Sequence, residues 1–149
     1  MPRTLGYLVT WTTYGTWLQG DERGYVKDGR VYAEDAALRQ SNVAAMNQDR
    51  LLLTPEQQQV VRDAIRLYAR RQGHKLLALA VRRDHFHIVL GYINEPLAGV
   101  VARYKTASRQ ALGGVGVHGR TWTAGYDKRF CFDTESLRRR IRYVNKHDI

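Results

Sequence analysis

The sequence has a single cysteine, Cys131, among its 149 residues. One cysteine excludes a disulfide framework and any zinc site built on paired cysteines, and it favours a reducing compartment. Apolar runs are short, since none approaches the roughly 18 residues that a membrane-spanning helix requires. The start, Met1-Pro2-Arg3-Thr4, leads into a strand-like segment and does not resemble a signal peptide. We therefore expect a cytoplasmic protein with no membrane partner.

Nucleotide-binding motifs are missing as well. The sequence contains neither the GxxxxGK[ST] loop of ATP- and GTP-binding proteins nor the GxGxxG turn of dinucleotide-binding domains. Chemistry driven by ATP or by a nicotinamide cofactor therefore has no support. A reaction catalysed by this chain would take its energy from the substrate itself.

Acidic residues are few relative to basic ones. The chain has 24 Lys and Arg against 14 Asp and Glu, which gives a formal net charge of +10, and the excess is largest over residues 101–149. A polyanion is the natural partner of such a charge. Nucleic acid is favoured over a membrane surface because no long basic amphipathic segment stands apart from the rest. A solvated basic surface with no specific ligand is the alternative interpretation.

The length predicts a single domain over residues 1–149 with one hydrophobic core. Three helices are predicted: one over about 55–72, one over about 97–112, and one from a capping Thr134 to the C-terminus. The first of them has the clearest signals, because Thr54 and Gln57 form a capping pair before an apolar face.

Strands are predicted where β-branched and aromatic residues gather, over 6–14, 76–81, 85–90 and 127–132. The polar segment of about 18–53, with a short helix near 34–46, is interpreted as an insertion. Without the insertion and the last helix, the order is βαββαβ. This order predicts an α+β fold, a ferredoxin-like (split βαββαβ) antiparallel sheet with helices on one face, plus an N-terminal insertion and a C-terminal tyrosine-bearing helix.

Two histidines lie on a strand that this topology places in the middle of the sheet. His85 and His87 are two residues apart, so their side chains project from the same face. Two parallel imidazoles suit a divalent metal ion. A half-exposed strand can also carry two histidines for structural reasons alone, so the pair by itself leaves both interpretations open.

The last helix offers a third imidazole and a phenol. Tyr143 and His147 are one turn apart, beside the apolar stripe that contains Val144. If the edge of this helix faces the open side of the sheet, both side chains can reach the histidine pair. The alternatives are that Tyr143 is an amphipathic residue at the edge of a packing stripe and that His147 belongs to a frayed, solvated helix end.

Several motifs in this order resemble the single-tyrosine HUH transposases, in particular the REP-associated tyrosine transposases and their IS200-like relatives. The resemblance covers nearly the whole chain. It rests on His85-Phe86-His87, on Tyr143-Val144-Asn145-Lys146-His147, on Thr12-Thr13-Tyr14-Gly15-Thr16-Trp17-Leu18 with Gly20-Asp21-Glu22-Arg23-Gly24, on Tyr104-Lys105-Thr106-Ala107-Ser108-Arg109, and on Thr134-Glu135-Ser136-Leu137. The family commonly has Gln or Asn four residues after the tyrosine, where this chain has His147. An imidazole can also bind a metal ion.

The resemblance implies a metal-dependent single-stranded DNA transposase that cleaves and rejoins DNA. Tyr143 would be the catalytic nucleophile and would form a 5′-phosphotyrosine intermediate. His85, His87 and His147 would hold the divalent ion, Mg²⁺ or Mn²⁺, with Zn²⁺ as a further option because all three ligands are nitrogens. Such a covalent intermediate conserves the energy of the phosphodiester, which agrees with the missing nucleotide-binding motifs.

Basic residues around these motifs are predicted to contact DNA. On the second helix they accompany Tyr104, a combination that can follow phosphates and stack a base. Tyr104 itself is a weaker candidate for the nucleophile, because Ser108 stands four residues after it. The predicted DNA-binding residues are Arg82, Arg83, Arg103, Tyr104, Lys105, Arg109, Arg140, Arg142 and Lys146.

The predicted partner is single-stranded DNA, with hairpin structure as the expectation from the family. A homodimer is compatible with the resemblance, since some relatives take the tyrosine helix from the partner subunit. The second hypothesis is a catalytically inactive, domesticated nucleic-acid-binding protein on the same scaffold. An RNA-recognition domain of similar topology is disfavoured, because the chain lacks a Lys/Arg-Gly-aromatic run.

Overall fold

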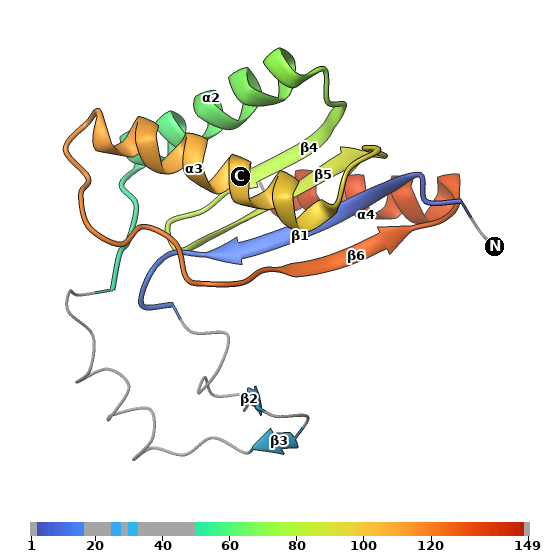
Figure 1. Cartoon of the computed structure of the whole chain (residues 1–149), viewed down its shortest axis with the longest axis horizontal. Coiled ribbons are helices and arrows are strands. Elements are labelled where there is room, and N and C mark those ends of the chain that lie inside the picture. Colours follow the sequence, from blue (N-terminus) through green and yellow to red (C-terminus); the bar gives the residue numbers. More distant parts are fainter. Residues whose placement is uncertain (1–2, 17–24, 28–29, 33–49, 148–149) are drawn as a thin grey trace.

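The computed structural model describes residues 3–16, 25–27, 30–32 and 50–147. Its main feature is a four-stranded antiparallel sheet with the strand order β4-β5-β1-β6 (Figure 1). The strands of this sheet are β1 (Gly6–Thr12), β4 (Leu76–Val81), β5 (His85–Gly91) and β6 (Asp127–Cys131). The helices are α2 (Pro55–Gln72), α3 (Leu97–Gly113) and α4 (Thr134–His147).

The order of these elements confirms the predicted ferredoxin-like arrangement. Helices α2 and α3 cover one face of the sheet, and α4 lies on the opposite face (Figure 1). Strands β1 and β5 are the central pair, as the topology requires, and β4 and β6 are the edges. The histidine-bearing strand is therefore hydrogen-bonded on both sides, which makes it a rigid support for a site.

The predicted insertion lies largely outside the described residues, and so does the short helix expected near 34–46. Within it, β2 (Tyr25–Lys27) and β3 (Arg30–Tyr32) form a separate antiparallel pair that the sequence interpretation did not anticipate. The segment rejoins the main body at Arg50. From there, Leu51 donates a backbone hydrogen bond to Tyr14, and Leu53 is buried.

Local sequence signals account for the start of α2. The Thr54 side chain accepts a hydrogen bond from the Gln57 backbone, and the Gln57 side chain accepts one from the Thr54 backbone. Pro55 takes the first helical position, where its missing N–H costs nothing. The helix ends at Gly73, whose φ of 72° is the left-handed conformation that glycine adopts without strain.

Helix α4 begins one residue earlier than predicted. Thr134 is the first helical residue rather than the cap, and the carboxylate of Asp133 accepts a 2.7 Å hydrogen bond from the backbone N–H of Ser136. A carboxylate is also the better cap here, because its negative charge faces the positive end of the helix dipole.

The two faces of the sheet are packed by unequal amounts of apolar material. The larger core lies under α2 and α3 and includes Trp11, Phe86 and Tyr104. The smaller one lies under α4 and consists of Leu8, Ala78, Ala80, Val89 and Val144, with Leu137 and Ile141 partly buried against it. The predicted apolar stripe of the last helix is thus the surface that docks it, on the side from which His85 and His87 project.

Candidate active site

His87 lies at the centre of the candidate site. Its side chain projects from β5 toward α4 and is buried, with 7% of its surface exposed. The hydroxyl oxygen of Thr10, on the neighbouring β1, lies 2.6 Å from the ring nitrogen Nδ1. This contact orients the ring and occupies Nδ1, so Nε2 is the nitrogen that remains to bind a metal ion.

The surroundings of His87 keep its imidazole neutral. Burial is the largest cause, and the charges of His85 and His147 add to it, so the pKa of His87 falls from 6.5 to about 4. Asp127 acts in the opposite direction. It stands on β6 directly across Thr10, which places His87, Thr10 and Asp127 in one row over three strands. A neutral imidazole is the form that binds a metal ion.

His85 is held by a carboxylate. Its Nδ1 lies 2.7 Å from Oδ1 of Asp84, and the other oxygen of Asp84 accepts a 2.6 Å bond from Arg50. Burial opposes the ionisation of Asp84, but the hydrogen bond from His85 and the charges of His85, Arg50 and Arg83 outweigh it and lower the pKa of Asp84. Histidines that bind metal ions are commonly oriented in this way, by a carboxylate on the ring nitrogen that does not bind the metal.

Helix α4 brings Tyr143 and His147 to the histidine pair. The ring centre of Tyr143 lies 5.6 Å from that of His87, and the ring centre of His147 lies 5.4 Å from it. His85 and His87 are 5.2 Å apart by the same measure. Val144 is fully buried beneath the helix, whereas Tyr143 keeps 44% of its surface exposed. A phenol that is both next to the imidazoles and open to solvent can meet a large substrate.

The end of α4 is tied to the hairpin that carries the histidines. His147 uses Nδ1 to hydrogen-bond the backbone carbonyl of Tyr143, at 2.8 Å. The backbone carbonyl of His147 accepts a 3.0 Å bond from the Arg82 guanidinium, in the turn between β4 and β5. The first contact lies within α4 and orients the His147 ring, and the second joins the helix end to the hairpin. His85, His87, Tyr143 and His147 thus lie together within one chain.

The donor atoms fit a divalent ion in their chemistry. In each of the three histidines Nδ1 is engaged, by Asp84, by Thr10 or by the Tyr143 carbonyl, which leaves three Nε2 atoms for an ion. Within the described ranges, no group of three or more His, Cys, Asp or Glu side chains already stands close enough to hold a metal ion. Binding of an ion by this set would therefore require side-chain adjustment.

Five of the predicted DNA-binding residues come from the elements that build the site. Arg82 and Arg83 lie in the turn before His85, and both are exposed. On α4, Arg142 and Lys146 are exposed, and Arg140 is half-buried. Arg82 reaches the site directly, through its hydrogen bond to the His147 carbonyl, and the other four lie on the same turn or helix as a site residue.

The predicted residues on α3 are not part of this group. Arg103, Lys105 and Arg109 belong to the helix layer on the other face of the sheet. Arg103 pairs with Glu95 at 2.7 Å. The Lys105 ammonium donates to the carbonyls of Thr123 and Gly125, and burial lowers the pKa of Lys105. Lys105 thus stabilises the loop before β6.

The prediction that Tyr104 stacks a base is wrong. Its side chain is fully buried, and its hydroxyl lies 2.8 Å from Nδ1 of His74. The ring also packs edge-on against Tyr68, with the ring centres 4.8 Å apart. Burial raises the pKa of Tyr104 well above its ordinary value, so the structure also disfavours it as a nucleophile. Tyr104 is a core residue of the α2 and α3 layer.

Three residues join the site that were not selected from the sequence for these roles. Thr10 and Asp127 reach His87 through strand pairing, and Asp84 orients His85. Asp84 directly precedes His85 and offered a local signal. Thr10 and Asp127 offered none, because they meet His87 only through the register of three strands distant in sequence.

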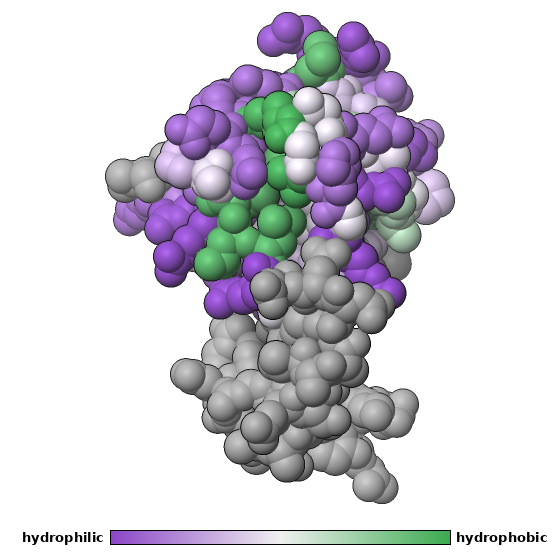
Figure 2. Space-filling model, turned by 90° about the vertical axis from the view of Figure 1, so that its left-hand side faces the viewer, coloured by the Kyte–Doolittle hydropathy of each residue, from purple (hydrophilic) through white to green (hydrophobic). Residues whose placement is uncertain are grey.

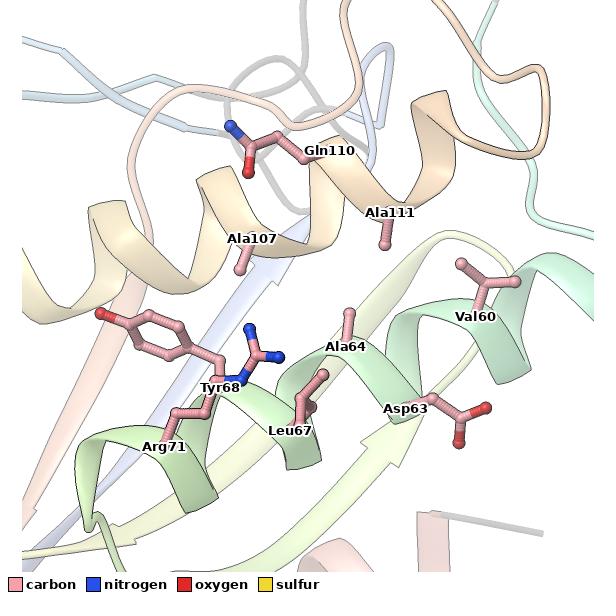
Figure 3. A pocket seen from close by; sticks show the side chains of 9 residues that line it. All are labelled: Val60, Asp63, Ala64, Leu67, Tyr68, Arg71, Ala107, Gln110 and Ala111. Carbon is pink, nitrogen blue, oxygen red and sulfur yellow. The ribbon is translucent and has the colours of Figure 1, made fainter.

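A pocket lies apart from this site, between α2 and α3. It has a volume of about 430 Å³ and is lined by Val60, Asp63, Ala64, Leu67, Tyr68, Arg71, Ala107, Gln110 and Ala111. In Figure 3 the side chains of Ala64, Ala107 and Ala111 point into the gap between the two helices. Figure 2 shows one end of the molecule, where apolar side chains gather in a patch within a largely hydrophilic surface. The pocket contains none of the predicted site residues.

Comparisons with known proteins agree with the topology. No protein-family model and no curated protein sequence matches the chain. A REP-associated tyrosine transposase, solved bound to a REP hairpin, aligns with a TM-score of 0.56 and 12% identity over 97% of this chain and 67% of that one. A protein from Deinococcus radiodurans R1, provisionally described as a transposase, aligns with a TM-score of 0.50 and 16% identity over 99% of this chain and 93% of that one. The chain therefore shares the fold of these transposases.

Proposed function

We propose that this chain is a metal-dependent, HUH-type transposase that nicks and rejoins single-stranded DNA through a 5′-phosphotyrosine intermediate. The observation that supports this best is the position of α4, which sets Tyr143 and His147 against His87 at ring separations of 5.6 and 5.4 Å. A helix docked on the other face would have left the histidines without a nucleophile.

The proposed reaction has two steps that mirror each other. The hydroxyl oxygen of Tyr143 attacks a backbone phosphorus, a new bond between that oxygen and phosphorus forms, and the bond from phosphorus to the 3′ oxygen breaks. The phenolic proton is lost and the leaving 3′ oxygen gains one. In the second step another 3′-hydroxyl attacks the phosphotyrosine and releases Tyr143. One phosphoester replaces another, so no nucleotide cofactor is consumed.

Three histidines would hold the divalent ion in this proposal: His85, His87 and His147. The ion would polarise a non-bridging phosphate oxygen and offset the charge that develops on it. The chain's own contribution is to prepare the ligands. Asp84 and Thr10 orient the two imidazoles of β5, and burial keeps His87 neutral.

The proposed substrate is single-stranded DNA with hairpin structure. The net charge of +10 and the exposed cations around Tyr143 suit a phosphate backbone. One of the two structural neighbours was solved with a hairpin bound. None of the described helices is long and apolar enough to cross a membrane. The tyrosine and the histidines meet within a single chain, so the proposal does not require the homodimer that the family resemblance allows.

A covalent-trapping experiment tests this function. The protein is incubated with labelled single-stranded hairpin oligonucleotides and Mn²⁺, then denatured. We expect a labelled protein–DNA adduct that is absent in Tyr143→Phe and present in the matched control Tyr92→Phe, which changes an exposed tyrosine elsewhere. An adduct that survives in Tyr143→Phe would refute the assignment of the nucleophile.

The alternative is a DNA-binding protein on this scaffold that has no cleavage activity. It is favoured by one observation, that no three metal-binding side chains in the described part of the chain already meet around one point. It predicts that His85→Ala with His87→Ala leaves both DNA binding and metal uptake unchanged. Measuring uptake of Mn²⁺ by equilibrium dialysis therefore separates the two functions.

A further inference from the structure

Strand β6 and the residues directly before and after it carry a row of aromatic and basic side chains at the edge of the sheet. Tyr126, Lys128, Phe130 and Phe132 alternate with Asp127, Arg129 and Cys131, so the first four share one face. We call these four residues the aromatic strip. Phe130 pairs with Tyr7 of the core under α2 and α3, which places the strip on the face opposite α4. Strand β6 is an edge of the sheet, so the strip has an open side (Figure 1).

The two phenylalanines of the strip are exposed although they are apolar. Phe130 keeps 42% of its surface exposed and Phe132 keeps 49%. Their rings stack on each other, with centres 6.3 Å apart and planes inclined by 28°. Phe130 is also held edge-on by the buried Tyr7, at 5.5 Å. Adjoining exposed aromatic rings are a feature of interaction surfaces.

A cation accompanies the rings. The ammonium of Lys128 lies 5.7 Å from the ring centre of Phe130 and 6.0 Å from that of Tyr126. Aromatic faces next to a positive charge are the pair of features by which proteins hold single-stranded nucleic acid, since bases stack on the rings and phosphates meet the cations.

The same charges disfavour a second copy of the chain as the occupant. Asp127, Lys128 and Arg129 are consecutive charged residues on an edge strand, a feature that discourages edge-to-edge pairing. Two copies would also each bring a net charge of +10. A single-stranded nucleic acid is complementary to the strip in two ways: its phosphates carry the charge opposite to Lys128, and the flat faces of its bases can stack on the rings.

We propose that the aromatic strip binds unpaired bases of a single-stranded nucleic acid by stacking. This inference rests on the proposed function for the identity of the ligand, but it assigns a separate surface. The strip and the histidine site lie on opposite faces of the sheet, and β6 forms the edge between them. At a strand rise of about 3.3 Å per residue, Phe132 is displaced roughly 17 Å in the strand direction from Asp127. A strand that occupied both surfaces would pass around the β6 edge, so the strip would hold nucleotides that flank the cleaved phosphate.

Binding is tested with Tyr143→Phe protein, so that no cleavage interferes. The affinity for fluorescent oligothymidylate is compared with that for an abasic oligonucleotide of the same length. We expect Phe132→Ala to weaken oligothymidylate binding about tenfold and to leave abasic binding unchanged. Phe130→Leu, which keeps apolar volume but removes the ring, should act in the same direction. Val115→Ala is the matched control, because Val115 is 53% exposed after α3.

A crosslinking experiment locates the contact without relying on variants. Oligonucleotides with iodouracil are irradiated on the Tyr143→Phe protein, and we expect the crosslink on the tryptic peptide of residues 130–138. Equal losses with both oligonucleotides, no loss with either, or a crosslink confined to other peptides would overturn the inference. So would a concentration-dependent dimer that Phe132→Ala abolishes, since a second copy would then be the occupant.

The two proposals fail separately. Covalent adducts from the protein with Tyr143 intact, combined with unchanged affinity in Phe132→Ala, would leave the transposase function standing and remove the strip. Weaker binding of oligothymidylate by Phe132→Ala, with no covalent adduct from the protein with Tyr143 intact, would support the strip and remove the transposase function.

Discussion

Protonation of His87 gives a sharp prediction about stability in acid. Folding lowers the pKa of His87 from 6.5 to about 4, chiefly through burial. Below pH 6.5 the His87 side chain of the unfolded chain therefore binds a proton, whereas in the folded protein it stays neutral until about pH 4. The contribution of neutral His87 to the free energy of unfolding is complete above pH 6.5 and decreases as the pH falls from 6.5 to about 4. Below about pH 4 it changes no further. A difference of this size corresponds to about 3 kcal/mol.

The measurement is urea denaturation of metal-free protein, with a chelator present, at several pH values from 7 to 4. The matched variant is His87→Asn, whose amide can still meet Thr10 but does not titrate. We expect the free energy of unfolding of the native protein to fall by about 3 kcal/mol more than that of the variant across this range. Parallel curves for the two proteins would show that burial in the fold does not keep His87 neutral.

Three further predictions address the core, the α4 cap and the metal. Tyr104→Phe should lower the free energy of unfolding by about 1 kcal/mol in urea, because His74 loses its partner, and should not change DNA affinity. Asp133→Ala should cost about 1 kcal/mol in the same assay through loss of the α4 cap, whereas Thr134→Ala should change little. Millimolar Mn²⁺ should raise the thermal midpoint of the native protein but not that of His85→Ala.

Each of these has a clear contrary result. Reduced DNA affinity in Tyr104→Phe would return that residue to the binding surface. A larger loss in Thr134→Ala than in Asp133→Ala would restore the cap predicted from the sequence. Equal thermal shifts in native protein and His85→Ala would place the bound Mn²⁺ elsewhere.

Features set by neighbouring residues could be predicted from the sequence. The α2 boundaries depend on Thr54, Gln57 and Gly73, all of which act within one helical turn of the helix ends. The hairpin of β4 and β5 was similarly local. The shared face of His85 and His87 follows from strand geometry alone, and the docked face of α4 follows from its apolar stripe.

Features that depend on distant pairing could not be predicted. The contact of Thr10 with His87 spans 77 positions and requires the register of β1 on β5. Tyr104 is a different case, because the apolar periodicity of its helix indicates burial while the neighbouring cations indicate exposure. Val100, Tyr104, Ser108 and Leu112 recur at four-residue intervals and are all buried, but the cations beside Tyr104 suggested an exposed role. For α3, the spacing of apolar residues predicts which side chains are buried better than the charge of their neighbours does.

The thin apolar layer beneath α4 has a consequence for how activity would be lost. The helix is held by one fully buried side chain, Val144, and a few partly buried ones, whereas the opposite layer has a much larger core. Partial unfolding starts where the least apolar surface must be exposed. Warming should therefore detach the nucleophile while the sheet and the histidine pair are still intact, and amide hydrogen exchange along α4 should outpace that of β5. Heat inactivation would then precede global melting.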